Sequence, residues 1–342
     1  MIITQAPLRV SFFGGGTDYP DHFLEHGGAV LGSAIDQYAF ITASRFDSKM
    51  FDYAVRISYR KTEIVQNLEE ISHTPFKEAL RLCGLEKDAE VNYFADLPAK
   101  TGLGSSSSFS VALLQALNAL TGNKLSGLDL AYAAIDFERR VLGERVGCQD
   151  QTFAAVGGFN VLEFVKEDDI RVTPLNLSDE RQEELNQHIL MVYTGITRRA
   201  EEVVQTQLKD VSSNRERYFR MRKQVDKAYN IITGTGAVTP FCELLHEAWE
   251  EKRSLHSVIS NPEIDTIYAK ARAGGAIGGK LLGAGAGGFL MLLAPPEKHA
   301  AIREILQDYI FLTPTLNAPA SHIVFDGTGR RLVNLGPLAR AM

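Results

Sequence analysis

The first apolar run of the chain, residues 2–13, has the β-branched and aromatic composition of a strand. Pro7 cannot donate a ladder hydrogen bond, so it predicts a bend or an edge position early in this strand. Three further short runs share this character and predict strands of the same sheet, with one helix between the last two. These elements are strands at residues 39–44, 55–59 and 91–95, and a helix at 75–83.

The stretch LPAKTGLGSSSSFSVALLQAL, residues 97–117, changes abruptly from small residues to an apolar helix. From Ser106 onward apolar residues cover nearly all faces, which indicates a buried helix. Gly102 and Gly104 let the backbone turn tightly and expose N–H groups, and the first turn of a rigid helix favours anions. The spacing is not that of a Walker A loop, because Lys100 precedes the glycines. The stretch predicts an oligophosphate site, although an ordinary capped turn has the same composition.

A second helix is predicted over residues 126–142, after a capping serine. Helical spacing places Glu138 on the same core-facing stripe as Ile135 and Leu142. A buried carboxylate without a cation is too costly to tolerate. Either a structural arginine or a metal ion should therefore meet Glu138, and the residues alone favour the arginine.

Two other polar positions have both a structural and a functional interpretation. Asp150 lies in GCQDQTF, a short polar break before a strand predicted at 159–165, and by itself it is typical of a helix N-cap. Near the N-terminus, three glycines precede Thr17 and Asp18. Glycines allow a ligand to approach the backbone, and Asp18 is a short acceptor suited to sugar hydroxyls. A turn with an Asx cap explains this segment equally well.

The second half of the chain begins after a charged, proline-bearing stretch, residues 166–187, which we interpret as the joint between two domains. The glycine-rich stretch 274–293 feeds into a buried strand, so its glycines permit close packing or ligand approach. Arg198 and Arg199 follow a turn and can bind phosphate, although paired arginines are more often solvated. The other expected elements are a strand at 189–193, helices at 214–232, around Trp249 and at 297–309, and a strand at 322–325.

Composition narrows the class of protein. With 342 residues, 45% hydrophobic and 23% charged, the chain fits a globular protein of about two domains. The net charge of −6 argues against nucleic acid as a partner. Cys83, Cys148 and Cys242 are odd in number and lack metal-binding spacing, which indicates a reducing compartment. The N-terminus has no secretory pattern and no apolar run is long enough to span a bilayer, so we expect a cytoplasmic protein without a membrane partner.

Three glycine-rich segments in this order resemble those of the GHMP kinase superfamily, which includes galactokinase, homoserine kinase and mevalonate kinase. PLRVSFFGGGTDYP is similar to the opening motif, LPAKTGLGSSSS to the middle motif, and GAGAGG at residues 283–288 to the third. The resemblance covers almost the whole chain. It implies an α+β fold of two lobes, with substrate in the cleft between them. The N-terminal lobe, residues 1–175, would carry the phosphate loop, and residues 188–330 would form a ferredoxin-like lobe.

The resemblance also implies roles for individual residues. Asp150 would be the catalytic aspartate, with Arg9 beside it and beside the reacting hydroxyl. Ser106 and Glu138 would ligate Mg²⁺, which replaces the arginine as the expected partner of Glu138. The residues expected to bind ATP are Lys100, Gly102, Leu103, Gly104, Ser105, Ser106 and Ser107. Those expected to bind substrate are Gly15, Gly16, Thr17, Asp18, Gly285 and Arg198.

Within the superfamily, FERRVLG, CQDQ and GGFNVLEF are similar to elements of the kinases that act on D-glycero-D-manno-heptose 7-phosphate. This implies ATP-dependent phosphorylation of a sugar anomeric hydroxyl, giving the 1,7-bisphosphate in bacterial heptose-nucleotide synthesis, by a monomer or homodimer. The alternatives are a kinase of a neutral hexose or fucose-like sugar, and a noncatalytic sensor that binds sugar and ATP. Gly15 and Gly16 stand where galactokinase has Glu-His, which disfavours galactose. The run of four serines also departs from the family pattern.

Overall fold

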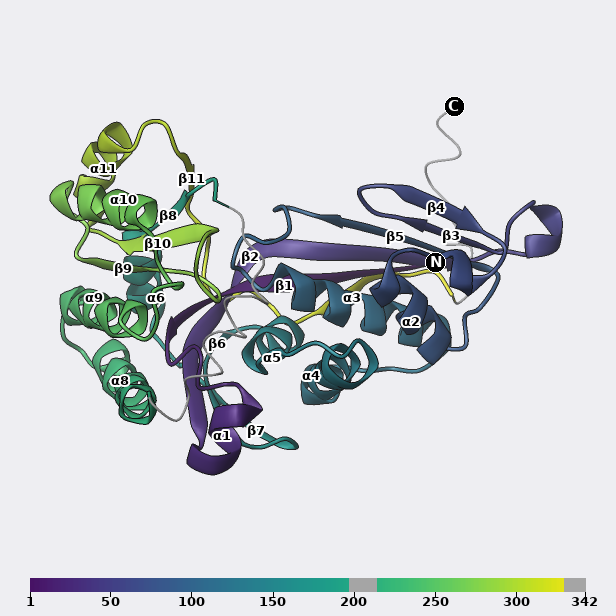
Figure 1. Ribbon diagram of the computed structural model, residues 1–342, viewed down its shortest axis with the longest axis horizontal. Coiled ribbons are helices and arrows are strands. Elements are labelled where there is room, and N and C mark those ends of the chain that lie inside the picture. The colour runs from purple at the N-terminus through teal and green to yellow at the C-terminus, as the bar shows by residue number, and fades with distance from the viewer. Residues whose placement is uncertain (197–213, 329–342) are drawn as a thin grey trace, which may run out of the picture.

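The computed structural model of the protein describes residues 1–196 and 214–328. Arg198 and Arg199, expected near the substrate, lie outside the described residues. Figure 1 shows a long sheet with helices along it, and a smaller sheet that carries its own helices. Over residues 1–196 and 214–328, no helix is both long enough and apolar enough to cross a bilayer.

The larger sheet has eight strands and is built around a long antiparallel pair, β1 (Ile2–Phe13) and β2 (Gly28–Arg45). Its main path runs β12-β1-β2-β5-β3-β4, while β6 pairs with the first part of β2 and β7 with β6. The other six strands are β3 (Val55–Ser58), β4 (Thr62–Val65), β5 (Ala89–Ala95), β6 (Phe159–Lys166), β7 (Asp169–Pro174) and β12 (His322–Asp326).

Helices α2 to α5 lie along one face of this sheet, and α1 lies beside β6 (Figure 1). They are α1 (Pro20–His26), α2 (Thr74–Leu82), α3 (Ser105–Leu120), α4 (Gly127–Asp136) and α5 (Gln149–Val156). Helix α3 is apolar on nearly every side because it is enclosed by β1, β2, α4 and α5. Two buried bonds fix it to β1: the Thr4 hydroxyl donates to the Ala112 carbonyl at 2.8 Å, and the Ser108 hydroxyl to the Pro7 carbonyl at 2.8 Å. The first turn of α3 is thus held against the middle of β1.

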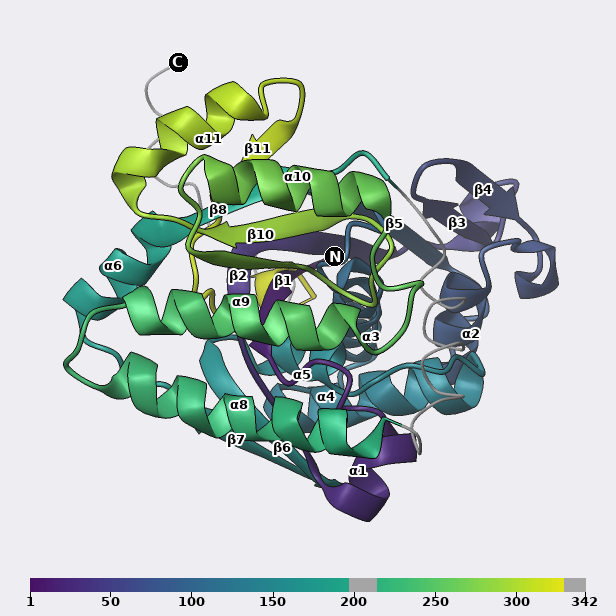
Figure 2. The same ribbon diagram turned by 60° about the vertical axis from the view of Figure 1, so that its left-hand side comes forward.

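The smaller sheet has the strand order β11-β8-β10-β9, which in chain order is fourth, first, third, second, as in a ferredoxin-like fold. Helices α8 and α9 lie on one side of it, and α10 and α11 on the other (Figures 1 and 2). Its elements are α6 (Asp179–His188), β8 (Ile189–Tyr193), α8 (Arg215–Thr233), α9 (Thr239–Arg253), α10 (Pro262–Ala273), β9 (Gly278–Leu281), β10 (Phe289–Leu293), α11 (His299–Ile305) and β11 (Ile310–Leu312).

A shared hydrophobic core joins the two sheets. Alternate residues of β8 point to opposite faces: Leu190 and Val192 pack in a cluster with α10, whereas Met191 packs in a cluster that includes β1. In that second cluster Phe12 of β1 meets Phe241 of α9, with ring centroids 5.4 Å apart. The smaller sheet and the helices packed on it form what we call the smaller lobe. The end of β1 is therefore covered by residues of the smaller lobe.

The expected strand at residues 2–13 is confirmed with both of its bounds. Pro7 predicts a bend or an edge position, and it lies where the register between β1 and β2 shifts, which agrees with a bend. The edge position is wrong, because β2 and β12 pair with β1 on its two sides. The strand expected at 39–44 is much longer and begins at Gly28, because this half of β2 is buried on both faces and lacks polar alternation.

The stretch expected as the joint, residues 166–187, is regular structure, and the chain passes from the larger sheet to the smaller one between β7 and β8. This stretch forms β7, which pairs with β6, and helix α6. Its charge reflects an exposed strand and a polar helix. Residues 322–326, which the sequence placed in the second lobe, form β12 and pair with β1 in the larger sheet.

Candidate active site

The loop before α3 has the backbone conformation that the sequence predicts. Gly104 is the N-cap residue with a φ of 76°, and Gly102 has a φ of 81°. The three N–H groups that follow a helix N-cap have no partner within the helix, and the macrodipole favours an anion there. Leu103 is fully buried, while Lys100 is exposed on the loop. The segment has the structure of a phosphate loop, and Lys100 and Ser106 are the exposed members of the predicted set.

The third glycine-rich segment packs directly on this loop. A Cβ atom at Gly283 would come within 2.8 Å of the Gly102 Cα, and one at Gly102 within 2.6 Å of a carbonyl oxygen next to Gly283. Gly288 likewise meets a loop carbonyl. Gly285, expected to bind substrate, has a φ of 120° and lies against the backbone of Ile259. Of the two interpretations left open, the structure shows close packing; the substrate role of Gly285 stays a prediction.

Arg9 and Asp150 form a two-pronged ion pair beside the loop. Arg9 Nε donates to Asp150 Oδ1 at 2.8 Å and Nη2 to Oδ2 at 2.7 Å. The remaining arm, Nη1, donates to the Gly102 carbonyl at 2.7 Å. Asp150 lies in the first turn of α5, whose N-cap is Cys148, so the N-cap interpretation of Asp150 is wrong. A Cβ at Gly104 would lie 3.2 Å from Asp150 Oδ2, so this carboxylate touches the start of α3.

Glu138 is buried, as its helical spacing predicts, with 1% of its surface exposed. Helix α4 ends at Asp136, and Glu138 lies in the π-helical turn that follows it. Its Oε2 accepts hydrogen bonds from the Ser107 hydroxyl at 3.0 Å and from the Gln151 amide, whereas Oε1 is buried without a partner among the described residues. Burial raises the pKa of this carboxyl to about 7, although hydrogen bonds from neighbouring side chains oppose the rise.

Two observations describe what lies around Glu138. Within residues 1–196 and 214–328, no arginine forms an ion pair with Glu138, so the arginine alternative is not supported. The serine in contact with it is Ser107, because the first turn of α3 directs Ser107 inward and leaves Ser106 exposed. Ser105, the first residue of the helix, is buried.

An unpaired carboxylate oxygen is the feature that suits a magnesium ion, since Mg²⁺ prefers oxygen ligands. Among the described residues, no three His, Cys, Asp or Glu side chains cluster as a metal site. A Mg²⁺ ion here would therefore take few ligands from the protein, as is usual where the ion also binds substrate phosphates. Glu138 and the exposed hydroxyl of Ser106 fit that arrangement, with Ser107 holding the carboxylate in place.

The N-terminal glycine segment forms a turn closed by its own side chains. The Thr17 hydroxyl lies 2.8 Å from the Gly14 carbonyl and accepts from the Ala29 N–H at 3.1 Å, so it is engaged by backbone. Gly16 has a φ of 108°. Gly15 leaves space toward Gln149, whose amide nitrogen is 3.8 Å from an ideal Cβ at this position. Thr17 thus shapes the turn, while the substrate contacts of the two glycines stay predictions.

Asp18 joins this turn to α5, the helix that carries Asp150. Its Oδ1 accepts from the Gly16 N–H, two residues before it, at 3.0 Å, and its Oδ2 accepts from the Gln149 N–H at 3.3 Å. The side chain is buried, and burial together with the nearby charge of Asp150 raises its pKa. Asp18 thus closes the turn by bonding back to Gly16, which differs from the expected Asx cap, and a sugar-hydroxyl contact stays a prediction.

Sequence analysis missed two buried lysines of the smaller lobe. Lys252, in the last turn of α9, donates to the Gly283 carbonyl at 2.9 Å. Lys280, in β9, donates to the Phe12 carbonyl of β1 at 3.1 Å. In the sequence, Lys252 belongs to the charged run EEKR at the end of a helix, which is typical of a solvated face. No feature of the neighbouring sequence distinguishes Lys252 from an ordinary solvated lysine at a helix end.

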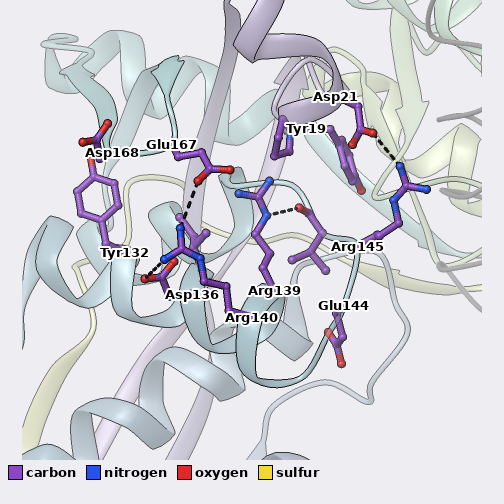
Figure 3. A pocket seen from close by; sticks show the side chains of 13 residues that line it. Tyr19, Asp21, Tyr132, Asp136, Arg139, Arg140, Glu144, Arg145, Glu167 and Asp168 are labelled. Carbon is purple, nitrogen blue, oxygen red and sulfur yellow. Dashed lines mark hydrogen bonds and ion pairs between the residues drawn. The ribbon is translucent and has the colours of Figure 1, made fainter.

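A pocket of 630 Å³ lies next to the N-terminal turn, beside Tyr19 (Figure 3). Its arginines are engaged by acceptors of the pocket itself: Arg140 with Asp136 and Glu167, Arg145 with Asp21, and Arg139 with the Val146 carbonyl. None of the residues predicted to bind ATP, substrate or metal lines this pocket. It is therefore separate from the site at the phosphate loop.

Comparison with known proteins agrees with this geometry. The N-terminal domain of GHMP kinases matches residues 64–158 and the C-terminal domain matches residues 226–310, together more than half of the chain. A D-glycero-alpha-D-manno-heptose 7-phosphate kinase of Campylobacter jejuni is 29% identical over 308 residues, covering 87% of this chain and 90% of the relative. A mevalonate kinase of Pyrococcus horikoshii is 28% identical over 327 residues, with 87% and 90% covered.

The fold has the same relatives. The crystal structure of a D-glycero-D-manno-heptose 1-phosphate kinase from Bacteroides thetaiotaomicron matches with a TM-score of 0.78 at 23% identity, over 95% of this chain and 99% of that one. A galactokinase of Lactococcus lactis, solved with galactose, matches with a TM-score of 0.73 at 18% identity over 94% of each chain. On both domain matches and the fold, the chain belongs to the GHMP kinase family.

Proposed function

We propose that the protein is an ATP-dependent kinase that phosphorylates the anomeric hydroxyl of a sugar, and that the sugar is D-glycero-D-manno-heptose 7-phosphate. The observation that carries the proposal is the Arg9–Asp150 pair, which lies against Gly104 at the start of α3. It places an oriented carboxylate next to a ready-made phosphate site. The choice of heptose 7-phosphate rests on the similarity to the C. jejuni enzyme of that name.

The phosphate loop would bind the phosphates of ATP. The free N–H groups after Gly104 would donate to the phosphate oxygens, and the positive end of the α3 macrodipole would attract them further. Glu138 and the Ser106 hydroxyl would hold Mg²⁺, which when bound neutralises charge on the phosphate oxygens. Ser107 and Gln151 keep the Glu138 carboxylate directed toward that position.

Asp150 would act as the base that takes the proton from the sugar hydroxyl. Both of its oxygens accept from Arg9, which fixes their orientation, yet 27% of the side chain is exposed and can meet a substrate. An anomeric hydroxyl is more acidic than an ordinary alcohol, so a carboxylate suffices as base. Arg9 positions Asp150 and is itself anchored on Gly102 of the phosphate loop.

The test is ATP consumption by the purified protein over a panel of acceptors: heptose 7-phosphate, unphosphorylated heptose, mannose, fucose, galactose and hexose phosphates. We expect the highest kcat/KM with heptose 7-phosphate, and a product whose new phosphate is on the anomeric carbon, seen by ³¹P and ¹³C NMR. Asp150→Asn should lower kcat by roughly 10² to 10⁴, while ATP binding measured by calorimetry is retained.

Different outcomes separate the alternatives. A higher kcat/KM for a neutral hexose or for fucose would reassign the substrate while leaving the kinase activity in place. Binding of ATP and sugar without any turnover would instead make the protein a sensor. Near-normal kcat in Asp150→Asn would remove this residue from the mechanism.

A further inference from the structure

We propose that Lys252, contributed by the smaller lobe, is a catalytic cation that contacts the phosphoryl group during its transfer. This inference rests on the proposed kinase function and assigns a residue that neither the sequence motifs nor the domain matches pointed to. The region is already rich in charge, with Arg9, Asp150 and Asp18 close together, and Lys252 is a cation of this region that has no carboxylate partner among the described residues.

The position of Lys252 is set by the contact between the two glycine-rich loops. Its ammonium group donates to the Gly283 carbonyl at 2.9 Å, and Gly283 packs on Gly102. From the other lobe, Arg9 donates to the Gly102 carbonyl at 2.7 Å. Two cations from different lobes are thus anchored on the carbonyls of two glycines that touch. The Lys252 ammonium therefore lies at the phosphate loop, although its helix is remote from that loop in the sequence.

The ammonium group retains unused hydrogen-bonding capacity. Lys252 is 6% exposed, and an ammonium has three N–H donors. Across residues 1–196 and 214–328, the Gly283 carbonyl is its one hydrogen-bond acceptor, and no carboxylate there pairs with it. Burying a cation without an anion is costly. An anionic ligand at this position would remove that cost.

The electrostatic surroundings place Lys252 within reach of the reacting groups. Burial lowers the pKa of the ammonium to about 8, and the nearby charge of Asp18 opposes this decrease. Arg9 lowers the pKa further and Asp150 raises it. The charges of Asp18, Arg9 and Asp150 therefore all act on the Lys252 ammonium through space. We place the oxygens of the moving phosphoryl group between the phosphate loop and this ammonium.

The chemistry requires such a cation. The sugar oxygen forms a bond to the γ-phosphorus of ATP, the bond from that phosphorus to the bridging oxygen breaks, ADP leaves, and Asp150 takes the hydroxyl proton. Negative charge is spread over the oxygens of the moving phosphoryl group. The charge of Arg9 is already balanced by both oxygens of Asp150. Lys252 supplies a positive charge that is not balanced in this way.

Lys280 provides a matched control. It is also a buried lysine of the smaller lobe, with 3% of its surface exposed, and it also donates to a carbonyl across the lobes. Burial lowers the pKa of Lys280, and the charges of Lys252 and Arg9 lower it further, so Lys280 lies in the same charged region. It differs from Lys252 in its acceptor, which is the carbonyl of Phe12 in β1 and not that of a glycine-rich loop. We therefore assign Lys280 to holding the lobes together, and we expect its loss to affect stability more than turnover.

The experiment compares Lys252→Met, Lys252→Gln, Lys252→Arg and Lys280→Met with the wild type, using the best acceptor of the sugar panel. We expect both neutral variants of Lys252 to lower kcat by roughly 10² to 10³, with the KM for ATP changed less than about 3-fold. Lys252→Arg should restore part of the lost kcat. Lys280→Met should keep kcat within about 3-fold of the wild type while lowering the Tm.

The outcomes distinguish this inference from the function on which it rests. A wild-type protein that phosphorylates no sugar refutes both. An active wild type with normal kcat in Lys252→Gln refutes the role of Lys252 alone, and so does a loss equal to that of Lys280→Met. A third contrary result is a raised KM for heptose 7-phosphate but not for unphosphorylated heptose, because Lys252 would then recognise the phosphate already on the sugar. Lys252→Gln keeps a donor for Gly283, so it remains informative if the methionine variant does not fold.

Discussion

Replacing Asp150 with alanine leaves the Arg9 guanidinium without its carboxylate in a place where water does not reach it. The Arg9 side chain is 5% exposed, whereas that of Asp150 is 27% exposed. We expect Asp150→Ala to lower the free energy of unfolding by about 3 kcal/mol, the size typical of a broken buried pair. Arg9→Met leaves a carboxylate that is partly hydrated and the Gly102 carbonyl unpaired, so its expected cost is smaller, about 1–2 kcal/mol.

The double variant separates the pair from its surroundings. With both partners removed, neither leaves the other as an uncompensated charge, so Arg9→Met with Asp150→Ala should cost less than the sum of the single changes, by about 2 kcal/mol. Urea unfolding followed by circular dichroism gives the four free energies. The pair Arg145–Asp21 has the same Nη2 to Oδ distance of 2.7 Å but side chains 55% and 41% exposed. Its coupling should be below about 1 kcal/mol.

Two results would refute this reasoning. The first is additivity of the Arg9 and Asp150 changes within about 0.5 kcal/mol, which would mean that the pair is not coupled. The second is a larger loss from Arg9→Met than from Asp150→Ala, because the order of the two follows from the difference in exposure. A coupling at Arg145–Asp21 as large as that at the buried pair would show that burial is not the cause.

Three further predictions follow from buried groups. Burial lowers the pKa of His22 from 6.5 to about 4, so between these two pH values the unfolded chain binds more protons than the folded chain. The free energy of unfolding therefore decreases as the pH falls through this range, and the loss at pH 5 is about 2 kcal/mol. Urea titrations at pH 7 and pH 5 should show this loss in the wild type and in exposed His322→Phe, and a loss smaller by about 2 kcal/mol in His22→Phe, where the lowered pKa values of His73, His246 and His299 still contribute. Glu138→Gln removes an unpaired charge, so its Tm, measured in EDTA at pH 8, should equal or exceed that of the wild type. In an assay with Mg²⁺, the turnover of the same variant should fall at least about 100-fold. Gly283→Ala should displace the phosphate loop and lower kcat/KM roughly 10²-fold, whereas Gly122→Ala, also at positive φ but with open space around its Cβ, should affect stability alone.

Local pattern was enough for some of the elements and for the phosphate loop. The strand at residues 2–13 and the buried helix after Gly104 follow from apolar periodicity, and the positive φ of Gly102 and Gly104 follows from the glycines themselves. Pattern failed where burial replaces alternation, as in the first half of β2, and it missed the strand β7 and the helix α6 within the charged residues 166–187. In both cases the pairing partner decides the structure, and the sequence does not state it.

The site was accessible from the sequence only in part. Helical spacing predicts that Glu138 is buried, but it lies in a π-helical turn beyond the regular helix, and the inward direction of Ser107 depends on where α3 begins. Arg9 and Asp150 are 141 residues apart, and no periodicity relates them; motif resemblance placed them together. Lys252 had neither kind of signal, because a lysine at a helix end is ordinarily solvated.

The contact of Gly102 with Gly283 explains why a loop of the smaller lobe is as rich in glycine as the phosphate loop itself. Any side chain at either position would meet backbone of the opposite loop, so only glycines let the two loops touch. Each of these glycines offers its carbonyl to a cation of its own lobe, Arg9 in one and Lys252 in the other. A shift of one loop against the other would therefore change the distance between the two cations. The position of the smaller lobe relative to the phosphate loop thus determines how positive charge is arranged around the phosphate site. A displacement of this lobe should lower kcat more than it lowers the affinity for ATP.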